Sequence, residues 1–543
     1  MGNGSRTNAG MGGTRMRQAF VRESMLARVD GAHFDVLVIG GGASGLGVAV
    51  DAASRGFSTC LVEAHDFAKG TSSRSTKLVH GGVRYLEQMD ISLVKEALHE
   101  RGLMHENAPH IVHDLAFIVP RYSWWEGPFY GAGLKLYDLL AGKRNLAPSR
   151  ALSVEATIAA IPNVARAGLL GSIEYHDGQF DDARMALALA RTAAEQGAVV
   201  LNRVRVTALR RSPSGTLTGA ECRDCESGRS LSIAARVIVN ACGIFSDEIR
   251  AMDDAAATPM VEPAQGVHLV LPREFQPSDR AVMVPHTDDG RVLFVIPWHD
   301  RVLVGTTDTP MTRANEEPRA LPEEVEFILR NAARYLEREP SRADVRAVFA
   351  GMRPLVHEGG IGGSTKSISR SHKVVVSRGG LVSIMGGKWT TYRRMAEDSM
   401  ARAIDVGGLA KRACATEALR IDGYLARDDR AMPKEEWLRA YGSRAEEVRR
   451  VCAECPAWSE PMHPRLPYPL GMAVYAARCE MARSVEDVLA RRTRGLLLDA
   501  RAARDASRRV AVAIAPELGW TPEQTEASAS EFVALAGGYL LDG

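Results

Sequence analysis

Short apolar runs with β-branched residues recur in the first half of the chain, and glycines or polar turn residues follow them. Residues 34–39 form the first run, residues 58–62 the second and residues 237–243 a later one that ends in small side chains. The stretch between the first two is rich in small residues as far as Arg55, which is typical of a helix packed closely on a sheet. Strand, helix and strand in this order predict an α/β fold with a parallel sheet.

Further along, the pattern changes to alternating strands and then to helices. Segments 199–207 and 231–233 predict a three-stranded β insertion. An antiparallel sheet is predicted from four short strands at 267–271, 281–284, 292–296 and 302–304. One helix is expected to begin at Asp181 or Asp182, either of which can cap it, and to end at residue 195. A second is expected from 322 to 338, with Pro322 in its first turn. Further helices are expected in a charged region after 421 that includes 484–515.

The turn after the first run carries a glycine pattern suited to a dinucleotide. Gly40 allows the tight turn, Gly42 lets the backbone approach a pyrophosphate, and Gly45 lets the helix pack on the strand. The helix N-terminus then faces the phosphates with unpaired N–H groups and the positive end of its dipole. Glu63 ends the second run, where a carboxylate accepts ribose hydroxyls. A lone glycine pattern is a weak signal, but strand, helix, strand and acid in order make this one specific.

Composition narrows the class of protein without identifying a partner. The 543 residues, 45% of them hydrophobic, suffice for two or three domains with full cores. A net charge of +2 argues against nucleic acid as a partner. No apolar run of about 18 residues and no apolar signal core are present, so we expect a cytoplasmic protein without a membrane-spanning helix.

The eight cysteines fit reduced thiols in a reducing compartment. Cys222 and Cys225 form one C-x-x-C pair and Cys452 and Cys455 another, and two such pairs are what a structural zinc site uses. We nevertheless expect no metal, because more than two hundred residues separate the pairs and no histidine joins either.

The segment after Glu63 combines hydroxyls, glycines and cations, which suit contacts with the phosphates and ring edges of a cofactor. It runs Lys69-Gly-Thr-Ser-Ser-Arg-Ser-Thr-Lys77 and then Leu78-Val-His-Gly-Gly-Val-Arg-Tyr-Leu86. Together with Gly40–Gly45, this run resembles the flavin-loop signature of the FAD-dependent glycerol-3-phosphate dehydrogenases. Motifs at 295–300, 305–308, 350–355 and 381–393 resemble the same family, so the resemblance covers roughly residues 34–515.

This resemblance implies a fold class and a division of the chain. We expect an α/β FAD-binding, Rossmann-like domain of the glutathione-reductase type, similar to D-amino-acid oxidase, with an antiparallel-sheet substrate domain and a C-terminal helical domain. The expected limits are a flexible extension (1–33), an oxidoreductase domain (34–420) with its FAD part at 34–110, 171–262 and 351–420 and its substrate part at 111–170 and 263–350, and the helical domain (421–543). Residues 110–150 are expected to form a helix or lid over the cofactor.

The resemblance also implies the site residues. It assigns FAD binding to Gly40, Gly42, Gly45, Glu63, Thr71, Ser72, Ser73, Lys77, His80, Gly81, Gly82, Gly243, Gly386, Gly387 and Lys388. Substrate binding is assigned to Arg84, Tyr85, Arg370 and Thr391, and catalysis to Arg353, Lys388 and His80. An arbitrary arginine more often forms a surface ion pair, and only the position in these motifs favours a site. His80 suits general base work by its ordinary pKa, although packing on the flavin is an alternative role.

The implied reaction is the oxidation of sn-glycerol 3-phosphate to dihydroxyacetone phosphate, with hydride transfer from C2 to N5 of FAD. Arginine forks suit the phosphate of such a substrate. The implied electron acceptor is ubiquinone or menaquinone. Three alternatives remain open: a glycerol-3-phosphate oxidase that uses oxygen, another FAD-dependent hydroxy-acid or amino-acid oxidoreductase, and a non-catalytic flavin-binding regulator.

A lipid-soluble acceptor implies peripheral contact with the inner face of the cell membrane, and a homodimer is compatible with the resemblance. Two basic stretches are candidates for this contact. One is Arg15–Arg28 and the other is Arg491–Arg494 with the neighbouring leucines 496–498. The alternatives are a loose tail for the first and a solvated helix end for the second.

Overall fold

The computed structural model describes residues 20–29, 31–82, 90–356 and 372–541. Its first sheet has the strand order β17-β18-β10-β1-β2-β7, with β9 and β8 joined to β10. Strands β1, β2, β7, β10 and β18 run parallel, and β17 is antiparallel at one edge. The bounds are β1 (His33–Ile39), β2 (Thr59–Val62), β7 (Val199–Leu201), β8 (Val204–Arg211), β9 (Leu217–Asp224), β10 (Ser230–Asn240), β17 (His372–Val376) and β18 (Leu381–Gly386). The predicted parallel sheet is confirmed.

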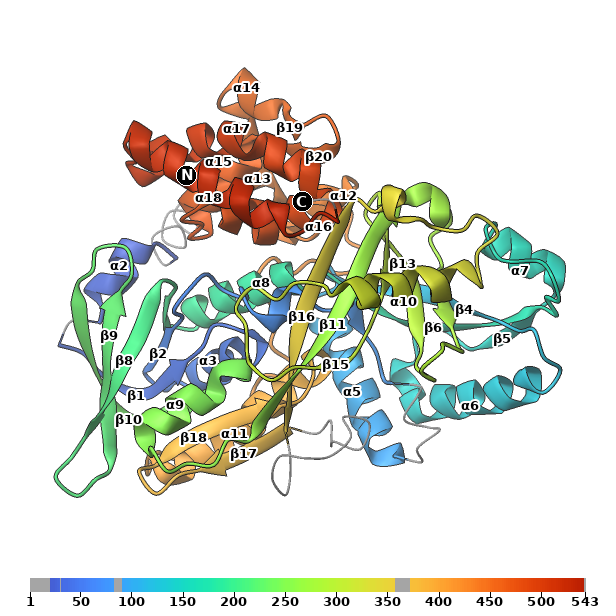
Figure 1. Ribbon diagram of the computed structural model, residues 1–543. Coiled ribbons are helices and arrows are strands. Elements are labelled where there is room, and N and C mark those ends of the chain that lie inside the picture. Colours follow the sequence, from blue (N-terminus) through green and yellow to red (C-terminus); the bar gives the residue numbers. More distant parts are fainter. Residues whose placement is uncertain (1–19, 30, 83–89, 357–371, 542–543) are drawn as a thin grey trace, which may run out of the picture.

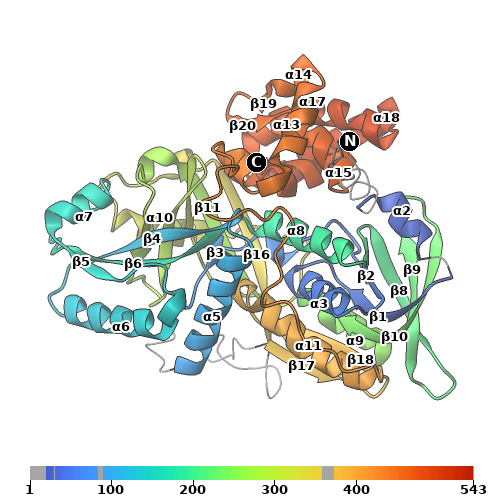
Figure 2. The same cartoon turned by 180° about the vertical axis from the view of Figure 1, so that it is seen from behind.

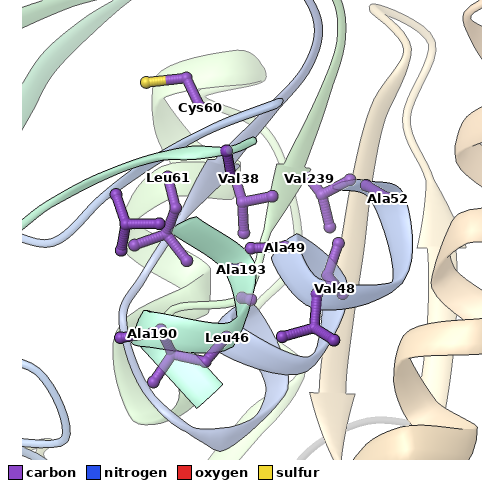
Figure 3. Packing of buried hydrophobic residues seen from close by; sticks show 14 of the residues in the cluster. Val38, Leu46, Val48, Ala49, Ala52, Cys60, Leu61, Ala190, Ala193 and Val239 are labelled. Carbon is purple, nitrogen blue, oxygen red and sulfur yellow. The ribbon is translucent and has the colours of Figure 1, made fainter. Parts of the chain in front are cut away.

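Four of the described helices cover the first sheet. They are α3 (Ala43–Ser54), α8 (Asp182–Glu195), α9 (Ser246–Asp253) and α11 (Tyr392–Val406). Two of them, α3 and α8, consist largely of small residues. Figure 3 shows Val38, Leu61 and Val239 of the sheet packed with Ala49 of α3 and Ala193 of α8. Alanines at these positions let the helices lie close to the sheet, which fixes the position of the α3 N-terminus.

The second sheet has the order β15-β11-β14-β13-β12-β4-β6-β3, with β16 paired to β11 and β5 to β6. Its strands are β3 (Leu78–Val79), β4 (Val112–Pro120), β5 (Arg150–Leu152), β6 (Ser172–Phe180), β11 (Val261–Pro272), β12 (Ala281–Val284), β13 (Leu293–Trp298), β14 (Arg301–Gly305), β15 (Thr309–Pro310) and β16 (Ala347–Val356). The four predicted antiparallel strands correspond to β11–β14. By contrast, β6 and β16 were expected in the FAD part and pair within this sheet.

Further helices flank the second sheet (Figure 1). They are α5 (Ile91–Asn107), α6 (Glu126–Ala141), α7 (Val154–Ala160) and α10 (Pro322–Ala333), whose first residue is the predicted proline. Both views place α6 along the outer edge of this sheet, away from β1 and β2, and it is the helix that was expected within residues 110–150 (Figure 2). Asp181 caps α8 as predicted, accepting from the backbone N–H of Arg184 at 3.0 Å.

The C-terminal helices pack across the second sheet and the loops between the sheets (Figure 1). They are α12 (Glu436–Arg439), α13 (Ala445–Ala453), α14 (Pro456–Ser459), α15 (Gly471–Cys479), α16 (Gly495–Leu498), α17 (Ala500–Leu518) and α18 (Pro522–Gly537), with the hairpin β19 (Pro461–His463) and β20 (Leu466–Pro469). The expected helix over 484–515 is interrupted, because Arg494 adopts a left-handed backbone conformation between a π-helical turn and α16. No helix among the described residues is long and apolar enough to cross a bilayer.

The described part of the N-terminal extension is anchored rather than loose. Helix α2 (Arg22–Ala27) buries Met25, and Phe20 and Val29 are also buried in the core of the first sheet. Arg22 pairs with Asp224 at 2.5 Å in a buried ion pair. Phe20, Met25 and Arg22 are therefore engaged inside the protein, which contradicts their predicted role in membrane contact; residues 1–19 lie outside the described part.

Candidate cofactor and substrate site

A cavity of about 220 Å³ lies at the carboxyl ends of β1, β2 and β10. Its lining includes Gly40, Gly42, Glu63, Thr71, Ser72 and Gly243, all of them predicted FAD contacts. Gly40 has φ +111, and a Cβ on Gly45 would lie 1.9 Å from the carbonyl oxygen of Gly40. A larger residue at position 45 would separate α3 from β1, and a Cβ at position 40 would lie 2.6 Å from the carbonyl oxygen of Ala241 after β10. The glycine pattern thus shapes a cradle at the start of a helix, as a pyrophosphate requires.

Two polar groups define the ends of this cradle. The Glu63 carboxylate accepts from the backbone N–H of Gly41 at 2.6 Å and from that of His65 at 2.8 Å, and it still faces the cavity. The hydroxyl oxygen of Ser72 accepts from the N–H of Ala43 at 2.9 Å, at the first turn of α3. A carboxylate for the ribose and a hydroxyl with helix N–H groups for phosphates are the donor and acceptor set that FAD needs, so the residues fit this cofactor.

The loop from 69 to 79 connects the cradle to the second sheet. The hydroxyl of Thr71 donates to the carbonyl of Met352 in β16 at 2.5 Å. The indole N–H of Trp389 donates to the carbonyl of Ser72 at 2.9 Å. These bonds bring β16 and the turn after β18 to the same loop, and so the two halves of the predicted site meet there.

Lys77 differs from the prediction of a direct cofactor contact. Its side chain is fully buried, and its ammonium donates to Asp182 at 2.7 Å and to the carbonyl of Ser73 at 2.8 Å. Burial lowers the pKa of Lys77 to about 7, against the opposing effect of the Asp182 charge. Ser73 is buried as well. In this structure both residues support the loop from behind, because Lys77 ties it to the first turn of α8.

Arg353 projects from β16 into a set of oxygen acceptors. Its guanidinium donates to Asp308 at 3.0 Å, to the hydroxyl of Thr306 at 3.1 Å and to the carbonyl of Thr307 at 2.9 Å. A Cβ on Gly266 would lie 2.4 Å from its Nη2, so that glycine leaves room for the fork. With 27% of its side chain exposed, Arg353 is oriented and remains accessible to an anion.

The turn after β18 supplies the remaining described candidates. Gly386 and Gly387 have φ +74 and +78, and Lys388 precedes the 3₁₀ turn Trp389–Thr391 that leads into α11. Thr391 is buried and its hydroxyl donates to the carbonyl of Lys388 at 3.3 Å. The hydroxyl of Thr390 donates to the carbonyl of His80 at 3.4 Å. The structure therefore brings His80 and the Lys388 turn together, whereas the predicted residues Arg84, Tyr85 and Arg370 lie outside the described part of the chain.

Sequence reasoning missed a buried support beneath Gly81. The hydroxyl of Tyr137 in α6 accepts from the N–H of Gly81 at 2.8 Å and donates to Asp177 at 2.7 Å. Arg101 pairs with the same carboxylate at 2.9 Å. Burial raises the pKa of Tyr137 well above its usual value, so the hydroxyl stays protonated. No local sequence pattern marks this tyrosine, because its partners come from other segments.

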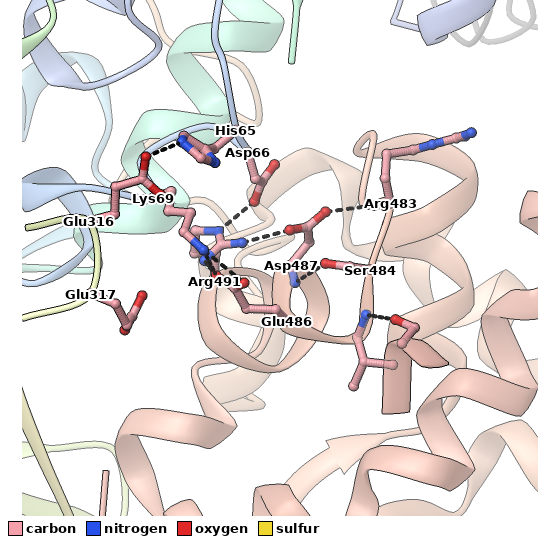
Figure 4. Close-up of polar contacts among 12 residues, drawn as sticks. His65, Asp66, Lys69, Glu316, Glu317, Arg483, Ser484, Glu486, Asp487 and Arg491 are labelled. Atoms are coloured by element: carbon pink, nitrogen blue, oxygen red, sulfur yellow. Dashed lines mark hydrogen bonds and ion pairs between the residues drawn. The ribbon is translucent and has the colours of Figure 1, made fainter. Parts of the chain in front are cut away.

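The predicted membrane role of Arg491–Arg494 is wrong. Arg491, Arg492 and Arg494 are only 2%, 2% and 1% exposed, and Leu496–Leu498 are buried too. Arg491 donates to Asp66 at 2.5 Å and Arg492 donates to it at 2.9 Å, while Arg494 donates to Asp182 at 2.9 Å. Figure 4 shows Asp66, Arg491 and Asp487 in one hydrogen-bonded group. These cations neutralise carboxylates of the cofactor loop and of α8, so they face the interior.

Comparisons with known proteins agree with this geometry. Residues 35–393 match the family model described as FAD dependent oxidoreductase, and residues 382–525 match that of the C-terminal domain of alpha-glycerophosphate oxidase. The mitochondrial glycerol-3-phosphate dehydrogenase of Mesocricetus auratus is 40% identical over 93% of this chain and 74% of its own length. The probable mitochondrial glycerol-3-phosphate dehydrogenase of Caenorhabditis elegans is 40% identical, over 92% and 72%.

Solved structures give the same picture. The glycerol-3-phosphate dehydrogenase of Bacillus halodurans, complexed with FAD, superimposes with a TM-score of 0.79 at 29% identity, covering 97% of this chain and 99% of that one. The L-alpha-glycerophosphate oxidase of Mycoplasma pneumoniae, with FAD bound, gives a TM-score of 0.56 at 17% identity, over 72% and 98%, and shares the fold.

Proposed function

Since this chain belongs to the FAD-dependent glycerol-3-phosphate dehydrogenases, we propose that it oxidises sn-glycerol 3-phosphate to dihydroxyacetone phosphate and that a membrane quinone receives the electrons. The observation that carries the proposal is the position of Arg353, a fixed and accessible cation one residue from the Met352 carbonyl that binds the cofactor loop. A cation beside a flavin site suits an anionic substrate better than a neutral one.

The residues of this chain have separate tasks in the proposal. Arg353 and Lys388 bind and orient the phosphorylated substrate, and Arg84 and Arg370 add charge to the same phosphate. The Asp308 carboxylate holds the Arg353 fork in place, so that little ordering is needed when the substrate binds. His80 accepts the proton of the C2 hydroxyl, a role that suits an imidazole because its reference pKa lies near neutral pH. When bound, FAD supplies the acceptor for the hydride that leaves C2 and passes two electrons on to the quinone.

The acceptor separates this proposal from its main rival, an oxidase that reduces oxygen. The relatives that align with most of this chain are named dehydrogenases and not oxidases, which favours an acceptor other than oxygen, and we propose a quinone in that role. We further propose peripheral contact with the inner face of the membrane, where ubiquinone or menaquinone would be reached, and a homodimer as the assembly.

Anaerobic reduction tests the reaction. We expect sn-glycerol 3-phosphate to bleach the visible flavin absorbance of the FAD-loaded protein, whereas glycerol, which lacks the phosphate, leaves it unchanged. A quinone analogue should restore the absorbance faster than oxygen does. Failure of the substrate to bleach the flavin would refute the dehydrogenase proposal, and rapid formation of hydrogen peroxide with slow quinone reduction would favour the oxidase.

A further inference from the structure

The outer face of α6 is an apolar surface that no other described element covers. Trp124 and Trp125, at its start, are 80% and 42% exposed, and Phe129, Leu136 and Leu139 are 50%, 39% and 76% exposed. These five belong to a group of twelve exposed large hydrophobic side chains found among the described residues. Scattered apolar side chains are normal on a protein surface, but this concentration on one helix marks an interaction site.

The spacing along α6 separates two apolar faces. Tyr130, Leu134, Tyr137 and Ala141 are buried against the second sheet, as the 3.6-residue period requires for an inner face. Phe129, Leu136 and Leu139 lie on the other side. A helix that is apolar on both faces needs a second apolar neighbour, and both views show its outer side as the edge of the molecule, opposite the C-terminal helices (Figures 1 and 2).

Charge around this face indicates what the neighbour is. Residues 121–150 contain five arginines and lysines but only two acids. Both acids are withdrawn from solvent, since Glu126 is 3% exposed and the Asp138 side chain 15%. Lys135 is exposed, at 65% of its side chain, and Lys143 is exposed as well, whereas Arg150, 63% exposed, also pairs with Glu174 at 2.8 Å. Tryptophans at one end, apolar residues between and cations at the sides are typical of a helix lying in the interface of an anionic membrane.

We propose that this outer face of α6 (Trp124, Trp125, Phe129, Leu136 and Leu139) is the surface with which the protein docks on anionic lipid, an inference that rests on the proposed quinone-dependent function. The opposite face of the same helix reaches the cofactor loop, because the Tyr137 hydroxyl accepts from the Gly81 N–H at 2.8 Å. An α-helix with its side chains is about 10–12 Å wide. Docking through α6 therefore places the bilayer close to the flavin loop.

Co-sedimentation with vesicles tests the proposal in the FAD-loaded, full-length protein. We expect binding to phosphatidylglycerol-rich vesicles, weakened by salt, and much less binding to phosphatidylcholine vesicles. The double variant Phe129→Ser/Leu139→Ser should lower the partition coefficient about tenfold or more, because each apolar side chain contributes through its burial in lipid. The matched control is Val512→Ser/Val533→Ser, which changes two residues 59% and 41% exposed on the C-terminal helices and should bind as the unaltered protein does.

Charge and activity readouts complete the test. Lys143→Gln should weaken binding about fivefold, as expected for one basic residue at an anionic surface, whereas Lys434→Gln before α12 should not. Oxidation of glycerol 3-phosphate with a water-soluble dye should be equal in all variants, while reduction of quinone embedded in vesicles should fall with lipid binding. Absence of dye activity in the unaltered protein would reject the proposed function without affecting the vesicle result.

Three outcomes would overturn the docking proposal. The unaltered protein fails to bind anionic vesicles, or the Phe129→Ser/Leu139→Ser variant binds them as well as its control does. The third outcome is that the unaltered protein is a dimer that does not bind vesicles, whereas the Phe129→Ser/Leu139→Ser variant is a monomer. The outer face of α6 would then join two copies of this chain.

Discussion

Replacing Asp66 by asparagine tests whether the C-terminal helical domain holds the cofactor loop in place. Asp66 lies just before the loop that lines the cavity, and its side chain is buried. The carboxylate accepts from Arg491 at 2.5 Å and from Arg492 at 2.9 Å. Asparagine keeps the shape of the side chain but removes the charge, so two buried guanidinium groups lose a common counter-ion.

The magnitude follows from how each arginine is compensated. Arg491 keeps Glu486 at 2.7 Å and Asp487 at 2.6 Å, whereas the other acceptor recorded for Arg492 is the backbone carbonyl of Glu480. Leaving a buried charge without its partner costs about 3–5 kcal/mol, and the lower end applies because Arg491 remains paired. If the whole loss of about 3 kcal/mol destabilises the ordered conformation of the loop that binds FAD, the Kd for FAD rises by about two orders of magnitude.

Titration of the apoprotein with FAD, followed by flavin fluorescence, measures this effect. Thermal unfolding of the apoprotein shows whether the same variant also loses stability without cofactor. Glu274→Gln is the control, since Glu274 and Arg338 form an exposed ion pair with 66% and 52% of their side chains exposed. Such pairs contribute about 0–1 kcal/mol, so FAD affinity should not change. An Asp66→Asn protein with unaltered FAD affinity and unaltered unfolding temperature would refute the reasoning.

Three further substitutions test the site and its support. Arg353→Ala should lower kcat/KM for glycerol 3-phosphate about tenfold or more, because a charge-assisted contact is lost, while the FAD content of the purified protein stays normal; near-normal efficiency would remove the residue from the site. Tyr137→Phe leaves the Gly81 N–H without its acceptor, so the free energy of unfolding measured in urea should fall by about 1–3 kcal/mol. An unchanged free energy of unfolding would argue against this support. The hydrogen bond from His176 to Asp114 raises the pKa of His176 in the folded protein. The stability that this bond contributes is fully present below the unfolded pKa of His176 and is lost as the pH rises through its folded pKa. Asp114→Asn should therefore lower the Tm more at pH 6 than at pH 9, and an equal loss at both pH values would contradict this.

Local constraints made the cofactor cradle predictable from the sequence. Gly40 and Gly45 are required by a tight turn and by close approach of α3, and such requirements act over a few residues. Glu63 ends a strand in register with β1, so its place follows from the order of elements. The buried strands were also predicted, since an apolar run with β-branched residues keeps its character whatever surrounds it.

Long-range partners made the rest unpredictable. Lys77 lies in a loop rich in hydroxyls and glycines, where contact with phosphates was a natural expectation, yet its carboxylate partner is 105 residues away. Arg491 sits in a basic run whose partner Asp66 is 425 residues away. A basic run looks alike in sequence whether it faces lipid or buried acids, because the pattern of charges does not record the pairing. The apolar outer face of α6 was missed for a different reason, because the glycines and aromatic residues there do not separate into an obvious pattern.

Burial of these ion pairs links the helical domain to the cofactor. Asp182 accepts from Lys77 and Ser75 of the loop at 2.7 Å each, and also from Arg494 of the C-terminal region at 2.9 Å. Lys77 of the loop and Arg494 of the C-terminal region thus share the Asp182 carboxylate of α8, and Arg494 also donates to the loop carbonyl of Ser73 at 2.8 Å. Binding free energies of this kind are reciprocal, so whatever FAD gains from a docked helical domain, the docked domain gains equally from bound FAD. The helical domain is in this sense part of the cofactor site, although none of its residues lines the cavity at the end of β1.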